Sequence, residues 1–306
     1  MQVLKFFVVL FITIVFCACN AGGGGGNSAG DPAITAMEQE LGTEAATPEQ
    51  KMELLNLYNG YIQQNPEGVA TATYLLRAAK LQYELNRFGA AEELLKARLR
   101  NFPEAEGNAE AALLLGEIYG QKMQKPQLAN VVYKNLTNRY PSTTQAVEAK
   151  GRINGVGTTI SEDIANIGNQ MFNDSLQRMD FRAANDYIAA TELYAIMNPG
   201  AADAPELLLK GAETARSVRN FQRALSMYEM VSTEYGNSPK AGQALFMRAF
   251  TLDNDLKRYD EARTLYEQFL EAYPNDEFAD DTRFLLENLG KSDEEIINSF
   301  TKKDAG

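Results

Sequence analysis

A spaced pattern that returns four times constrains the fold of this chain more than any other feature. An alanine marks each copy, at Ala91, Ala129, Ala224 and Ala262. The first two alanines are 38 residues apart, and so are the last two. A period in this range, with helical spacing inside each copy, indicates a solenoid of α-helical hairpins.

Each copy carries further members at fixed offsets from its alanine. A small residue lies thirteen positions before the alanine, a large apolar residue four positions after it, and an aromatic residue eleven positions after it. In chain order the sets are Ala78, Gly116, Gly211 and Ala249; Leu95, Tyr133, Tyr228 and Tyr266; and Phe102, Tyr140, Tyr235 and Tyr273. The small residue permits close approach of the two helices in a unit, and we expect the large side chains to form the core between units.

The pattern predicts an all-α, α–α solenoid over residues 47–290, wound as a right-handed superhelix of about five units. Thr47 and Pro48 begin its first helix as a cap and a first-turn proline. The third unit, between Thr158 and Pro199, is degenerate and enlarged, and Thr159 with Glu162 forms a capping box at its start. We expect the surplus residues of this region to lie in the linker 142–157 and in the long turn 172–180.

The carboxyl-terminal end of the array should be closed by a capping helix over residues 278–289. Phe284, Leu285 and Leu289 are expected to face inward, and Gly290 to end the helix. Ser292 and Glu295 then begin a short terminal helix within the tail 291–306. Terminal repeats of a solenoid need a polar outer face, which Asp280, Asp281 and Glu287 of the capping helix would supply.

The amino terminus carries the pattern of a targeting segment. Residues 1–19 have one early positive charge, at Lys5, and an apolar run that is too short to span a bilayer. The run ends at Phe16-Cys17-Ala18-Cys19, which resembles a bacterial lipobox with Cys19 as the lipidated residue. An ordinary cleaved signal and an uncleaved anchor are the alternatives.

Residues 20–46 are expected to form a flexible tether between the lipid anchor and the solenoid. Five consecutive glycines at 22–26 are typical of flexible coil. Asp31 and Pro32 start one short helical pattern (Ile34, Met37, Leu41), which is either a docking element or weakly structured. Asn20 is not the aspartate that similar lipoproteins use for inner-membrane retention. The resemblance therefore points to a periplasm-facing protein of the outer membrane.

Composition excludes several classes of function. The net charge is −12, and removal of residues 1–19 takes away one lysine and no acid, so the mature chain is more acidic still. Such a chain repels phosphate backbones, which argues against nucleic acid as a partner. Histidine is absent, and both cysteines lie in the lipobox. The commonest general base and metal ligand are therefore missing, and we expect no enzymatic activity, no cofactor and no metal site.

The alanine–aromatic–proline pattern resembles the tetratricopeptide repeat. The resemblance is clearest in RYDEARTLYEQFLEAYP (Arg258–Pro274) and EAALLLGEIYG (Glu110–Gly120). Together with the lipobox, it is similar to the outer-membrane lipoproteins of the β-barrel assembly machinery (the BamD type) and to the accessory repeat protein of the Tol–Pal system. The resemblance implies a non-catalytic adaptor that binds envelope proteins or peptides in a concave groove, although the enlarged middle and the glycine tether depart from those proteins.

In repeats of this kind the first helix of each hairpin lines the groove. The position fourteen before each alanine holds Arg77, Leu115, Lys210 and Arg248, so three cations in register predict a basic stripe for carboxylates or an acidic peptide. A solvated flank whose charges pair with nearby glutamates is the alternative. The other alternative is an apolar groove, lined two positions away from this column by Leu75, Leu113, Leu208, Phe246 and Phe250. Lys80 and Glu117 lie beside either track.

Three alternatives to the adaptor are a glycan-related function, a calcium site and a phosphate-binding loop. A glycan-binding or cell-wall-hydrolase accessory lipoprotein is the main alternative, but tryptophan, the usual sugar platform, is absent. Asp253, Asp255 and Asp260 lack the glycine and terminal glutamate of the known calcium loop. Gly151, Gly155 and Gly157 have neither the preceding strand nor the following Gly-Lys-Ser/Thr of a phosphate cradle.

Overall fold

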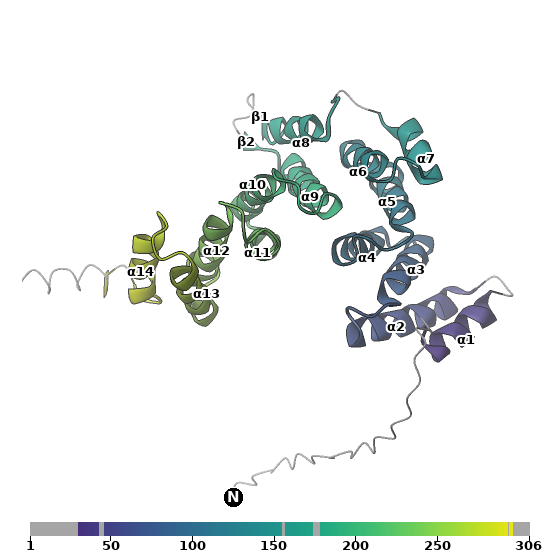
Figure 1. Ribbon diagram of the computed structural model, residues 1–306, viewed down its shortest axis with the longest axis horizontal. Helices are drawn as coiled ribbons and strands as arrows, with labels where there is room; N and C mark the ends of the chain where they lie inside the picture. The colour runs from purple at the N-terminus through teal and green to yellow at the C-terminus, as the bar shows by residue number, and fades with distance from the viewer. Residues whose placement is uncertain (1–29, 43–45, 155–156, 174–177, 293, 296–306) are drawn as a thin grey trace, which may run out of the picture.

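The protein is a succession of antiparallel helical hairpins, as the computed structural model in Figure 1 shows for residues 30–42, 46–154, 157–173, 178–292 and 294–295. The helices in chain order are α1 (Pro32–Leu41), α2 (Pro48–Gln64), α3 (Thr71–Glu84), α4 (Phe88–Asn101), α5 (Asn108–Glu117), α6 (Pro126–Arg139), α7 (Thr144–Arg152), α8 (Ile160–Asn169), α9 (Phe181–Met197), α10 (Ala204–Ser217), α11 (Phe221–Glu234), α12 (Ala241–Phe250), α13 (Tyr259–Ala272) and α14 (Ala279–Glu287). Single π-helical turns, η1 (Ile118–Lys122) and η2 (Thr251–Asp255), extend α5 and α12. The prediction of an all-α solenoid is confirmed.

Local signals place the helix starts where the sequence indicated them. Thr47 accepts a hydrogen bond from the backbone N–H of Gln50, whose side chain accepts one from Thr47 in return, and Pro48 occupies the first helical position of α2. Thr159 and Glu162 make the same reciprocal pair at the start of α8. Such capping boxes satisfy N–H groups that have no partner within the helix.

The seam of small and aromatic residues forms the core of each hairpin. The four marker alanines are at most 3% exposed, and Tyr228 and Tyr266 are fully buried. At Gly116 an added Cβ would lie 2.2 Å from a ring carbon of Tyr133, so only glycine fits beside the ring in its present position. The close approach that the sequence predicted is therefore present.

The four regular hairpins turn through one residue in the left-handed backbone conformation. These residues are Asn86, Gln124, Arg219 and Lys257, with φ between 56° and 62°, and each lies five positions before its marker alanine. Left-handed backbone is uncommon for residues other than glycine and asparagine. Helix–turn geometry, rather than residue preference, therefore sets the conformation at three of the four turns.

The hairpins follow an arch with two arms, which is plain in Figure 1. The first arm comprises α1–α7 and the second α9–α14, with α8 packed on α6 and α9 at the top of the arch. Helices α4 and α11 lie on the inner side, and α9 contacts both α4 and α6. The first helices of the hairpins, α1, α3 and α5 in one arm and α10 and α12 in the other, lie on the outer sides, which face away from each other.

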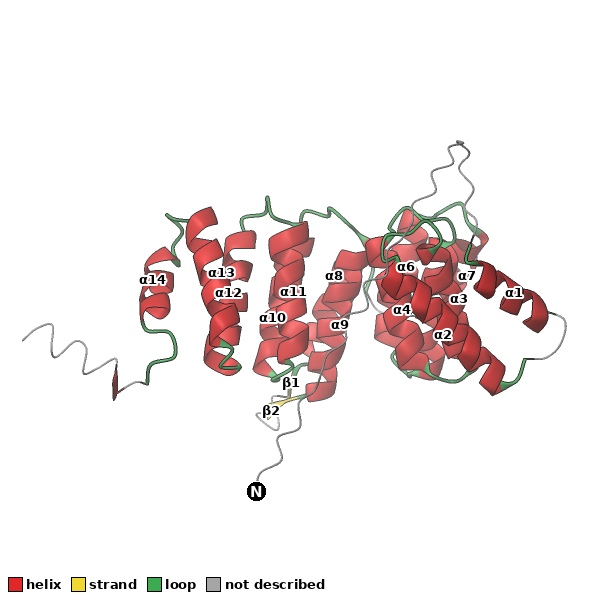
Figure 2. Cartoon of the chain, turned by 90° about the horizontal axis from the view of Figure 1, so that it is seen from below, coloured by secondary structure: helices red, strands yellow, loops and turns green. Residues whose placement is uncertain are grey.

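Three segments differ from the sequence-based expectation. Part of the expected tether is folded: α1 packs on α2, and Ile34 is only 1% exposed because it enters a cluster with Leu54, Leu55 and Tyr58. The expected linker 142–157 contains α7, which packs on α5 and α6. The long turn 172–180 contains a two-stranded antiparallel hairpin, β1 (Phe172–Asn173) and β2 (Arg178–Met179), which projects at one edge in Figure 2.

The capping helix α14 ends the array, but it buries a different face from the one that the sequence predicted. α14 packs on α13, and its buried residues are Ala279 and Thr282. Leu285 and Leu289 are partly buried against the same cluster, whereas Phe284 is 43% exposed, so its inward assignment was wrong. The reason is that the first turns of α14 are the part of this helix that packs on α13. The terminal helix expected after Ser292 lies largely outside the described residues, although Ser292 and Glu295 do exchange capping hydrogen bonds.

Candidate partner-binding surfaces

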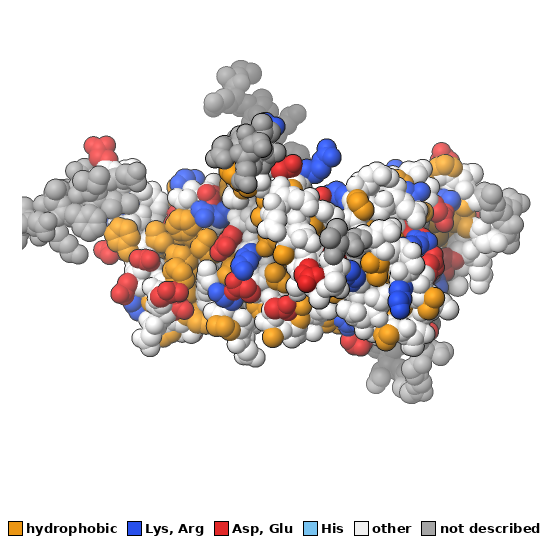
Figure 3. Space-filling model, turned by 90° about the horizontal axis from the view of Figure 1, so that it is seen from above, with side chains coloured by type: hydrophobic (Ala, Val, Ile, Leu, Met, Phe, Trp, Pro, Cys, Tyr) orange, Lys and Arg blue, Asp and Glu red, His pale blue; other side chains and the backbone are white. Residues whose placement is uncertain are grey.

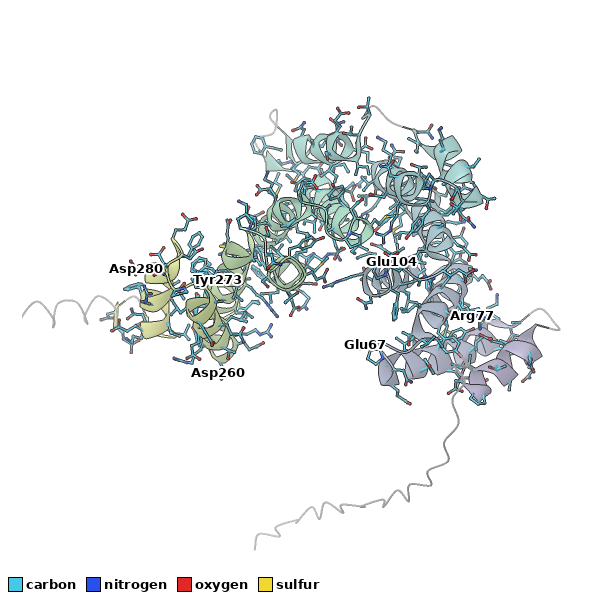
Figure 4. All side chains as sticks on the ribbon, in the orientation of Figure 1. Glu67, Arg77, Glu104, Asp260, Tyr273 and Asp280 are labelled. Carbon is cyan, nitrogen blue, oxygen red and sulfur yellow. The ribbon has the colours of Figure 1, made fainter. Side chains whose placement is uncertain are left out.

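The outer surface of the first arm carries a ladder of ion pairs between neighbouring outer helices. Each pair joins one outer helix to the next, from α1 through α3 and α5 to α7. The pairs are Arg77 with Glu38 (2.5 Å), Lys80 with Glu110 (2.6 Å) and Arg152 with Glu117 (2.6 Å). Figure 4 shows Arg77 at the edge of α3 beside α1. The predicted residues Arg77, Lys80 and Glu117 are thus brought together on one surface.

These surface pairs are easily exchanged for contacts with another molecule. The side chains of Arg77, Lys80 and Glu110 are 44–47% exposed. Exposed ion pairs contribute about 0–1 kcal/mol each, since water screens them. A partner that supplies its own carboxylates and cations would therefore displace them at little cost.

In the second arm the other predicted cations are arranged differently, because Lys210 lies exposed on the outer helix α10 whereas Arg248 of α12 reaches the inner helix α11. Lys210 and Lys240 both contact Glu206, at 3.2 and 3.0 Å, and Arg248 contacts Glu229 at 2.8 Å. Hydrogen bonds from Lys240 and Lys210 hold the pKa of Glu206 below its ordinary value.

The predicted basic stripe is not a single surface. Arg77 belongs to the first arm and Lys210 and Arg248 to the second, while Leu115, at the equivalent position, is fully buried. The position lies at the edge of the helix interface. A long cation there reaches water past its own apolar stem, whereas a leucine stays in the interface.

The alternative apolar groove was wrong for most of its members. Leu75, Leu208 and Phe246 are at most 8% exposed and belong to the core. Phe246 stacks on the ring of Phe278 at 4.6 Å, so its burial is completed by the neighbouring unit. Leu113 and Phe250 remain partly exposed. Figure 3 shows hydrophobic side chains gathered towards the end of the molecule where α12 and α14 lie, with acidic side chains around them.

An ion cluster with a buried centre, Lys96 and Glu192, joins the inner sides of the two arms, and sequence reasoning missed it. Lys96 of α4 is 4% exposed and contacts Glu192 of α9 at 3.0 Å and Glu93 at 2.9 Å. Arg223 of α11 donates to the same Glu192, and Arg100 of α4 pairs with Glu234 of α11 at 2.5 Å. We call this set the clasp (Glu93, Lys96, Arg100, Glu192, Arg223 and Glu234).

The members of the clasp other than Glu234 line a polar cavity of about 400 Å³ between α4, α9 and α11. Beside it, the hydroxyl of Tyr119 donates to Glu92 at 2.7 Å, and burial raises the pKa of that tyrosine. A buried ion pair is strongly destabilised when one partner is removed, since the other charge stays in a poorly solvated place. The clasp therefore favours the arrangement in which the inner helices face each other and the outer helices face away.

Nothing in the described part of the chain forms a group of three or more acidic, cysteine or histidine side chains able to hold a metal. Two of the aspartates weighed for calcium are engaged elsewhere: Asp255 pairs with Arg216 at 2.5 Å, and Asp253 accepts from the hydroxyl of Tyr266 at 3.3 Å. Among the helices that the structure describes, none has the length and apolar character to cross a bilayer. Cys19 lies outside the described residues.

Comparison with known families identifies two of the hairpins. The tetratricopeptide repeat model matches residues 110–143 and 243–276, which hold α5–α6 and α12–α13. A search of curated proteins found no match. The chain therefore carries tetratricopeptide repeats, which generally mediate protein–protein interactions and are typically non-catalytic.

Proposed function

We propose that this tetratricopeptide-repeat protein is a non-catalytic adaptor of the bacterial cell envelope that holds two partners, one on the outer surface of each arm. One observation carries the proposal: the outer helices of the two arms face away from each other because the clasp joins their inner helices. Two surfaces that point apart can hold two proteins without collision.

The charges of the outer surfaces favour polar, exchangeable contacts. Arg77 and Lys210 lie on a chain of net charge −12, and each of the two pairs with a glutamate. Complementary charges of this kind contribute to the rate of association and to specificity more than to affinity. A protein partner that presents both signs of charge fits these surfaces.

The place of action is proposed from the amino terminus. Lipidation of Cys19 would tether the solenoid to the outer membrane through a glycine-rich segment and leave it in the periplasm. Assembly of outer-membrane proteins, or a Tol–Pal-like complex, is the kind of machinery that such an adaptor serves.

The anchor has a direct test. Cys19→Ser removes the lipidated thiol and should move the protein from the membrane fraction to the soluble periplasmic fraction, since the apolar chains that hold it are lost. If the variant still needs detergent for extraction, lipidation at Cys19 is refuted.

The adaptor function is tested by altering one arm at a time. The first variant combines Arg77→Gln and Lys80→Gln, and the second combines Lys210→Gln and Lys240→Gln, the two lysines that pair with Glu206. In-cell cross-linking followed by mass spectrometry should show that each variant loses a different set of partners. Arg258→Gln is the matched control, because Arg258 is 44% exposed and, among the residues that the structure describes, its ion pair is with Glu261 at the start of its own helix.

Two outcomes contradict the proposal. One is a full set of partners in both variants, with circular dichroism unchanged. The other is recovery of the wild-type protein with no cross-linked partner.

A further inference from the structure

A second cavity, of about 500 Å³, lies in the second arm between the hairpins α10–α11 and α12–η2. It is bounded by the outer helices α10 and α12 and is separate from the clasp. Its lining includes Glu213, Arg216, Phe221, Tyr228, Met247 and Asp255. Both apolar and charged side chains therefore converge on it.

The hydroxyl of Tyr228 is buried in this lining without a hydrogen-bond partner among the described residues. The equivalent tyrosine of the next unit, Tyr266, donates to Asp253. A buried hydroxyl that has lost water and gained no partner destabilises the fold, because the free energy of its hydration is not replaced. Tyr228 thus keeps a buried hydroxyl to which the described residues of the two hairpins offer no hydrogen-bond donor or acceptor.

The charged side chains around this hydroxyl differ in whether they form ion pairs with other described residues. Arg216 is engaged twice, with Asp255 at 2.5 Å and over the ring of Phe250 at 4.9 Å. Glu213, at the rim, makes no ion pair within the described part of the chain, and burial together with the nearby Glu206 raises the pKa of its carboxyl. Arg219 stands exposed on the outer rim, in the left-handed turn.

We propose that this cavity receives a lysine side chain of a protein partner, an inference that rests on the adaptor function. The ammonium group would lie between the carboxylate of Glu213 and the phenolic oxygen of Tyr228, both of which accept hydrogen bonds. The methylene stem would lie against Phe221 and Met247. At this position a carboxylate would lie beside Glu213, while Arg216 is already paired with Asp255 and the second cation of the lining, Arg219, lies in the exposed outer turn.

Lysine suits the cavity better than arginine. An ammonium is compact and needs three acceptors, which Glu213, Tyr228 and a water molecule supply. A guanidinium spreads its charge and five donors over a plane, and part of that plane would face the guanidinium of Arg216. The acidic character of the whole chain further favours a cationic ligand.

The test is a titration of the full chain with Nα-acetyl-lysine methylamide, followed by backbone NMR shifts. We expect saturable shifts confined to the cavity residues, with a dissociation constant on the order of 1 mM, because a single side chain makes few contacts. The Nε-acetylated analogue keeps the shape and loses the charge, so it should produce no shifts.

Two variants and one matched control sharpen the result. Tyr228→Phe should weaken lysine binding about fivefold and leave the fold as stable or more stable, because it removes an unpartnered hydroxyl. Glu213→Gln should weaken binding at least as much. Glu267→Gln removes the same charge from α13, outside the cavity, and should leave binding unchanged.

Several outcomes overturn the proposal. These are the absence of shifts, equal shifts with both ligands, shifts spread over acidic residues throughout the chain, or unchanged affinity in Tyr228→Phe and Glu213→Gln. Because the probe is a free amine, the titration is independent of any natural partner. Lysine binding without captured partners refutes the adaptor alone, whereas captured partners without lysine binding refute only the cavity.

Discussion

Replacement of Gly116 by alanine should destabilise the second hairpin, although alanine normally favours a helix. Gly116 lies in α5, and an added Cβ would lie 2.2, 2.7 and 2.8 Å from three ring carbons of Tyr133. Real Cβ contacts are essentially never shorter than 3.0 Å. The ring is 3% exposed and packed in the main core, so it must move by about an ångström against neighbours that are themselves close-packed.

The magnitude follows from two opposing terms. Overpacking of a close-packed core costs about 1–3 kcal/mol. Alanine in place of glycine inside a helix gains about 1 kcal/mol. The difference between the two terms is a net loss of up to about 2 kcal/mol in the free energy of unfolding.

Gly60→Ala is the matched control. Gly60 lies inside α2, and an added Cβ there meets no atom within 4 Å. This variant should gain about 0.5–1 kcal/mol from helix propensity alone. The double variant Gly116→Ala/Tyr133→Leu copies the pair that the first unit uses, Ala78 with Leu95, and should recover part of the loss.

The assay is urea unfolding followed by circular dichroism, with hydrogen exchange in α5 and α6 to localise the effect. Ala249 stands at the equivalent position opposite Tyr266 in the last unit. The clash therefore depends on the ring position of Tyr133 and not on the residue pair alone. A Gly116→Ala protein as stable as Gly60→Ala would refute the reasoning about the close approach.

Two further predictions concern charged groups. Lys96→Met should lower the free energy of unfolding by about 3 kcal/mol, since it leaves Glu192 buried with fewer partners; an unchanged urea midpoint would show that the clasp does not join the arms. NMR titration should find the pKa of Glu206 below its ordinary value, and Lys240→Ala should raise it. Because the folded pKa is the lower one, the stability that Glu206 contributes is present above its unfolded pKa and is lost as the pH falls through the folded value; a Glu206 pKa that does not respond to Lys240→Ala would contradict this assignment.

The repeat seam could be predicted from the sequence because each member sits at a fixed offset in every unit. Ala91, Ala224 and Tyr228 are buried, as their spacing indicated. A solenoid repeats its local packing, so a periodic pattern carries most of the information about the core. The packing of α1 on α2 could not be predicted in the same way, because the single apolar stripe of α1 has no equivalent in the other units.

The clasp could not be predicted, because it joins residues that only the bend of the enlarged middle brings together. Arg100 and Glu234 are 134 positions apart, and neither stands out from the other charged residues of its helix. The prediction of one basic stripe was wrong for a related reason. A register counted along the sequence does not show that Arg77 and Lys210 lie on different arms. The sequence also could not show that the hydroxyl of Tyr228 lacks a partner among the described residues, since Tyr228 and Tyr266 occupy the same position of the repeat.

Site-specific photo-cross-linking tests the two-sided architecture most directly. A photoreactive residue at Lys80 or Lys210 reports on the outer surfaces, whose side chains are 44% and 54% exposed, and one at Glu93 reports on the inner side. We expect adducts with other proteins from both outer positions, and from Glu93 an intrachain link to α11. Partner adducts from Glu93 without that intrachain link, and none from the outer positions, would contradict the two-sided architecture.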